Sequence, residues 1–94
     1  LRSHSVFYYN EALSSALLSD NLKIAEKTAK KLISIKDKTP QSLYLVGSYF
    51  LKIGEIKKAI VYFEESLKNC NNETCTLDFK ERIISAITLL KKNQ

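Results

Sequence analysis

The chain contains little glycine and little proline, two glycines and one proline among its 94 residues. A fold made of many short strands needs turn-forming residues about every 8–12 residues. The scarcity of both residues argues against a β-rich fold. Its 45% hydrophobic and 27% charged residues are typical of a folded domain, and low-complexity tracts are absent. We therefore expect one small helical domain.

Methionine and long apolar stretches are absent as well. With no methionine the chain has no initiator residue, so we expect it to be processed or cut from a longer chain. No apolar run approaches the roughly 18 residues of a transmembrane helix, so no membrane span is expected. No secretory leader is visible, but a trimmed chain would have lost it, and secretion stays open.

Residues typical of catalysis are scarce. His4 is the one histidine and lies next to the N-terminus, and no glycine-rich phosphate loop or Ser/His/Asp set occurs. The carboxylates stand at helical spacing from lysines, as Glu26 does from Lys30, which predicts solvated ion pairs. We expect no enzymatic activity, no cofactor, no metal and no small-molecule substrate.

Apolar residues recur at spacings of three and four, which predicts amphipathic helices. Thr39-Pro40 is a helix start signal, since threonine caps free backbone donors and proline needs none. Gly54 is a stop signal. The expected helices run from Val6 to Leu18, Leu22 to about Lys38, Gln41 to Ile53, Ile56 to about Leu67, and Thr74 to Lys92.

The segment Pro40–Glu73 is a 34-residue unit with a recurring pattern of large and small residues. Large apolar residues and one glycine occupy its first helix, and alanine, an aromatic residue and serine occupy its second. These positions hold Leu43, Val46, Gly47, Phe50, Gly54, Ala59, Phe63 and Ser66. The pattern resembles the tetratricopeptide repeat (TPR) family. We interpret Gly47 and Ala59 as small because the two helices of the unit cross closely there.

The same frame, shifted back by 34 residues, fits Val6–Thr39 less well, because Leu13, Asp20 and Ala29 replace the usual glycines and aromatic residue. Residues 74–92 then resemble the closing helix of such arrays. The resemblance implies an all-α, right-handed α-solenoid fragment of five helices: repeat 6–39, repeat 40–73 and a capping helix, in a single domain. Two repeats are few for a stable array, so we expect further domains, a partner or self-association.

Members of the TPR family bind a peptide or a helix in a concave groove lined by the first helix of each unit. Carried over to this chain, the groove positions are Phe7, Asn10, Ser14 and Leu17, then Gln41, Tyr44, Ser48 and Leu51, then Cys75, Asp78, Arg82 and Ser85. Such a groove suits an amphipathic helix or an apolar segment of another protein. The alternative is that Phe7, Tyr44 and Leu51 merely complete a small core.

The resemblance therefore implies a protein-interaction module, an adaptor, scaffold or assembly factor. Two alternatives stay open. The chain is an oligomerising segment of a larger scaffold, or it binds an acidic partner or nucleic acid weakly through a basic stripe. That stripe consists of Lys23, Lys27, Lys30 and Lys31. Nucleic-acid sites usually carry denser charge and stacking aromatic residues, which disfavours the last alternative.

Cys70 and Cys75 flank the loop before the last expected helix. A zinc site would need two more ligands, and none is near. A disulfide is sterically allowed there and would require an oxidising compartment, and the alternative is two free thiols in the cytosol. The cysteine pair and the trimmed start favour an exported, periplasmic or lipid-anchored bacterial protein. Asn72-Glu73-Thr74 also matches a glycosylation sequon, a match that is common by chance.

Overall fold

The computed structural model describes residues 2–36 and 38–93, with side chains from Ser5 onward. It confirms an all-α fold, and no strand occurs in these residues. Within these residues the chain forms five helices, α1 (Arg2–Leu18), α2 (Leu22–Ser34), α3 (Pro40–Lys52), α4 (Ile56–Lys68) and α5 (Leu77–Lys92). The side chain of His4 lies outside the described part.

Three helix boundaries differ from the sequence prediction by more than one residue. Helix α1 begins at Arg2, before Val6. Helix α2 ends at Ser34, and Ile35 turns to extended backbone so that its side chain packs on the core. Helix α5 begins after Thr76, whose hydroxyl accepts a hydrogen bond from the Phe79 N–H. The prediction chose Thr74, but that residue belongs to the preceding loop.

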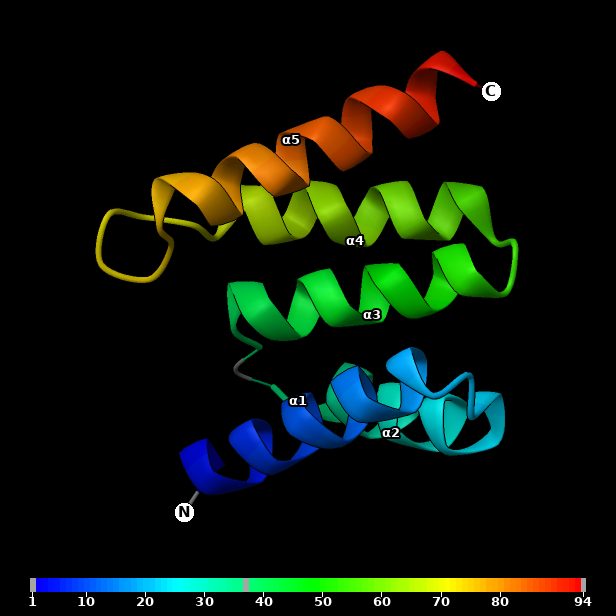
Figure 1. The fold of residues 1–94 in the computed structure, drawn as a ribbon. Helices are drawn as coiled ribbons and strands as arrows, with labels where there is room; N and C mark the ends of the chain where they lie inside the picture. Colours follow the sequence, from blue (N-terminus) through cyan, green and yellow to red (C-terminus); the bar gives the residue numbers. More distant parts are fainter. Residues whose placement is uncertain (1, 37, 94) are drawn as a thin grey trace.

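The helices form two hairpins and a closing element. Helix α1 packs against α2, α3 packs against α4, and α3 also contacts both helices of the first hairpin. Helix α5 packs mainly on α4, and Figure 1 shows it covering the side of α4 opposite the first hairpin. Connections of a few residues force each helix to run back along its predecessor.

The turns of the two hairpins have the same backbone structure, 34 residues apart. Asp20 and Gly54 both adopt positive φ, 58° and 84°. Asn21 N–H donates to the Ala16 carbonyl at 2.9 Å, and Glu55 N–H donates to the Phe50 carbonyl at 2.8 Å. Each turn is therefore a Schellman-type helix end. The first turn keeps this geometry without glycine because aspartate tolerates the left-handed region.

The interior consists of two apolar clusters that meet at α3. The first lies between α1, α2 and α3, and the second between α3, α4 and α5. Ala25 and Ala59, one period apart, are both fully buried. A Cβ atom on Gly47 would lie 2.9 Å from the Phe63 ring and 3.3 Å from the Ala59 carbonyl oxygen. The close crossing expected at Gly47 and Ala59 is thus present.

Candidate protein-binding surface

The expected groove residues of α1 divide into packed and exposed side chains. Leu17 is half-buried and packs on the first cluster. Asn10 ties α1 to α3, because its Oδ1 accepts a hydrogen bond from the Ser42 hydroxyl at 2.7 Å. Ser14 is half-buried. Phe7, by contrast, is 68% exposed and is available to a partner.

The expected groove residues of α3 serve mostly to hold the fold together. Tyr44 packs against Phe63 and Phe79, with ring centroids 5.4 Å apart in each case, so it belongs to the second cluster. Ser48 donates its hydroxyl to the Tyr44 carbonyl of its own helix. Leu51 remains 39% exposed.

Gln41, at the start of α3, reaches the next unit of the chain. Its side-chain amide donates a hydrogen bond to the Thr74 carbonyl at 2.8 Å. Although Gln41 is exposed, its amide thus joins the start of α3 to the loop before α5. Like Asn10, it acts as a link between units and is not a free groove contact.

The expected groove residues of α5 also divide. Cys75 is buried and bonded to Cys70, so it offers no binding contact. Asp78, Arg82 and Ser85 are exposed. They lie on a helix that packs mainly on α4 and meets α3 through Phe79 and Tyr44.

Four exposed leucines lie outside the expected groove positions: Leu18, Leu22, Leu77 and Leu89. Leu18 is 85% exposed and Leu89 is 60% exposed. Leu18 lies eleven residues after Phe7, about three helical turns, and therefore on the same side of α1. Helical periodicity puts Leu18 beside Phe7, at the edge of the α1 face that carries the expected groove positions, and that placement was the one available signal. We call Phe7, Leu18 and Leu51 the exposed apolar set.

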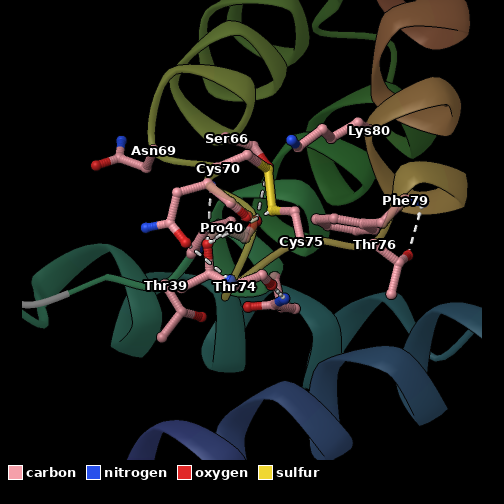
Figure 2. Close-up of a disulfide and its surroundings, with 12 residues drawn as sticks. Thr39, Pro40, Ser66, Asn69, Cys70, Thr74, Cys75, Thr76, Phe79 and Lys80 are labelled. Atoms are coloured by element: carbon pink, nitrogen blue, oxygen red, sulfur yellow. Dashed lines mark hydrogen bonds between the residues drawn. A yellow bond between two sulfur atoms is a disulfide. The ribbon is translucent and has the colours of Figure 1, made fainter.

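The loop between α4 and α5 is closed covalently. Cys70 and Cys75 form a disulfide, with their Cα atoms 5.4 Å apart. Figure 2 shows the bond joining the end of α4 to the chain just before α5, with Phe79 beside Cys75. Cys70 and Phe79 both pack on the second cluster. The disulfide therefore ties the chain to the end of α4 just before the closing helix begins.

The lysines of the basic stripe are all exposed. Lys30 forms an ion pair with Glu26 at 3.5 Å, and α2 contains no aromatic residue on which a base could stack. The neighbouring Tyr49 of α3 is buried, and burial, followed by the charge of Glu26, raises the pKa of its hydroxyl. The stripe has the character of a solvated outer face.

Other kinds of site are not evident in the described residues. A shallow depression of about 220 Å³ is lined by Lys36, Lys38, Leu43, Glu65 and Asn69, away from the exposed apolar set. No group of three or more histidine, cysteine, aspartate or glutamate residues within this part is arranged to hold a metal ion. None of its helices is long and apolar enough to cross a membrane.

Comparison with known proteins gives no relative, since no protein-family model, curated protein or solved structure matches this chain.

Proposed function

We propose that this chain is a protein-binding module of the TPR type, which holds a peptide or an amphipathic helix of another protein against α1 and α3. Support for the repeat comes from the two Schellman-type turns and from the buried alanines at the same 34-residue distance. A solenoid of helical hairpins presents the first helices of successive hairpins on one side. Here these are α1 and α3, which are in contact.

The observation that carries the proposal is the exposure of Phe7 and Leu18 on one side of α1. A phenylalanine at 68% and a leucine at 85% exposure contribute almost nothing to the core. Large apolar side chains that are left in water on one side of a helix are candidates for contacts with a partner. Leu51 extends the apolar character of this surface to α3.

An oligomerising segment is the alternative, in which the occupant of this surface is a second copy of the chain. The same exposed apolar set would then be covered in a homodimer. Static light scattering over a range of concentrations distinguishes the two, because a monomer leaves the surface free. The disulfide supports the proposal that the chain functions in an oxidising compartment and not in a reducing cytosol.

The test of the proposal is a selection from a displayed library of random peptides, followed by fluorescence anisotropy with the selected sequences. The informative variants are Phe7→Ser and Leu18→Ser. The control is Val61→Ser, which alters an exposed valine of α4. Since all three side chains are exposed, each variant should fold with its stability changed by no more than about 0.5 kcal/mol.

We expect each α1 variant to weaken binding at least about tenfold, since a central anchor contributes more than about 1.4 kcal/mol. Val61→Ser should bind like the unmodified chain. Equal affinity of all variants would refute the proposed surface, as would amide chemical-shift changes on binding that map to α2 and α4. A stable dimer that dissociates on Phe7→Ser substitution would support the oligomerising alternative instead.

A further inference from the structure

The loop between α4 and α5 carries a feature that protein binding does not use. Asn72-Glu73-Thr74 is the one Asn-X-Ser/Thr sequence in the chain. Residues 71–74 are all exposed. In Figure 1 the loop, drawn in yellow, projects beyond the ends of the helices. A bulky group attached at this point would extend into solvent and would not meet the packed clusters.

The hydrogen bonds of the loop leave the amide nitrogen of Asn72 available. Asn71 Oδ1 accepts from the backbone N–H groups of Glu73 and Thr74, at 2.8 and 2.9 Å. Asn72 uses its Oδ1 to accept from Lys80 at 3.2 Å. Among the described residues, its Nδ2 has no hydrogen-bond partner. The loop shape therefore depends on Asn71 and on the disulfide, and not on the Nδ2 of Asn72.

The disulfide and the sequon point to the same compartment. A disulfide forms and persists in an oxidising lumen or outside the cell. Attachment of a glycan to an Asn-X-Ser/Thr sequence occurs on surface loops of secreted proteins. Cys70 and Cys75 bracket the sequon at distances of two and three residues from Asn72. The two features thus reinforce each other in a single six-residue loop.

We propose that Asn72 is a site of N-linked glycosylation. The donor is an oligosaccharide linked through its anomeric carbon to a lipid pyrophosphate. A bond forms between Asn72 Nδ2 and the anomeric carbon, while the bond from that carbon to the pyrophosphate oxygen breaks. The lipid pyrophosphate leaves with the electron pair, and the amide loses one proton to a base. No atom changes its oxidation state.

The contacts of Thr74 decide what must open before the sequon can be modified. Its hydroxyl accepts a hydrogen bond from the Asn71 N–H at 3.0 Å, whereas a transferase must read that hydroxyl and the Asn72 amide together. The hydrogen bonds between Asn71 and residues Glu73 and Thr74 all lie within this exposed loop. A transferase therefore has to open the bond between the Asn71 N–H and the Thr74 hydroxyl, and opening it disturbs no contact of the two packed clusters.

The test is expression of the chain behind a cleavable leader in a eukaryotic secretory pathway, with intact mass measured before and after an amidase that removes N-linked glycans. Asn72→Gln removes the acceptor. Thr74→Ser keeps the hydroxyl and its contact with Asn71. Asn69→Gln is the matched control, because Asn69 is an exposed asparagine just before the same loop but outside the sequon.

We expect the unmodified chain, Thr74→Ser and Asn69→Gln to carry one glycan that the amidase removes, and Asn72→Gln to carry none. The measurement includes the protein retained in the cells, so a variant that folds poorly still reports whether transfer occurred. An unmodified mass for the original chain in both fractions would overturn the proposal. So would a glycan that persists in Asn72→Gln.

Discussion

Replacing Gly47 by alanine tests the close crossing of α3 and α4. Alanine is favoured over glycine inside a helix by about 1 kcal/mol. Against this gain, the new Cβ would lie 2.9 Å from two atoms of the Phe63 ring and 3.3 Å from the Ala59 carbonyl oxygen. Phe63 is buried and its ring contacts Tyr44, so the ring has little room to move. Overpacking of this kind costs about 1–3 kcal/mol.

The clash therefore outweighs the helix preference, and we expect Gly47→Ala to lower the free energy of unfolding by about 1 kcal/mol, the middle of the range left by these two terms. In a domain of this size that corresponds to a fall in Tm of about 4–8 °C. Urea denaturation followed by far-ultraviolet circular dichroism measures the change, with an unaltered m-value as evidence that the unfolding reaction is the same.

A matched control and a rescue variant separate the helix preference of alanine from the steric clash with Phe63. Ser48→Ala makes an alanine at the next position of α3, where the side chain becomes smaller, so no clash arises and stability should hold or rise slightly. Phe63→Leu removes ring atoms that the new Cβ would meet, so Gly47→Ala should cost less in that background than alone. If Gly47→Ala stabilises the chain, the reasoning about the crossing is wrong.

Three further predictions concern other contacts. The Cys70→Ser/Cys75→Ser double variant should lose about 2 kcal/mol of stability, which is the loop-entropy value for a six-residue loop. Helix α5 should remain helical, because it still buries apolar side chains. Amide exchange that shows α5 unprotected would contradict this. Ser66→Ala should cost about 0.5–1.5 kcal/mol in urea denaturation, because the buried hydroxyl donates a hydrogen bond to the Pro40 carbonyl at 2.7 Å that the variant loses. An unchanged midpoint would count against this. Burial raises the pKa of the Tyr49 hydroxyl in the folded chain. The stability that this hydroxyl contributes is therefore complete below its pKa in the unfolded chain, about 10, and is lost as pH rises through its pKa in the folded chain. Tyr49→Phe should accordingly lose less stability between neutral and strongly alkaline pH than the original chain, and an equal loss would argue against a role for this hydroxyl.

The repeating architecture could be predicted from the sequence alone. Helical spacing of apolar residues, Thr39-Pro40 and Gly54 act within a few residues of chain, so the sequence contains all that they need. The 34-residue period also makes Asp20 equivalent to Gly54, and the structure shows a left-handed backbone at both residues. In contrast, the predicted start of α5 at Thr74 was wrong. Thr74 and Thr76 are both good capping residues, and the sequence pattern does not distinguish them. The hydrogen bonds of Asn71 draw Thr74 into the loop.

Only the tertiary structure decided which expected groove residues are available. Periodicity shows that Tyr44 and Phe7 lie on particular sides of their helices, but it cannot show what covers those sides. The second hairpin and α5 enclose Tyr44 between Phe63 and Phe79, whereas no described element covers Phe7 or Leu18. Exposure depends on contacts between segments far apart in the chain, and a local pattern carries no information about them. The sequence by itself therefore determined the helices and their repeat, and packing determined the surface left for a partner.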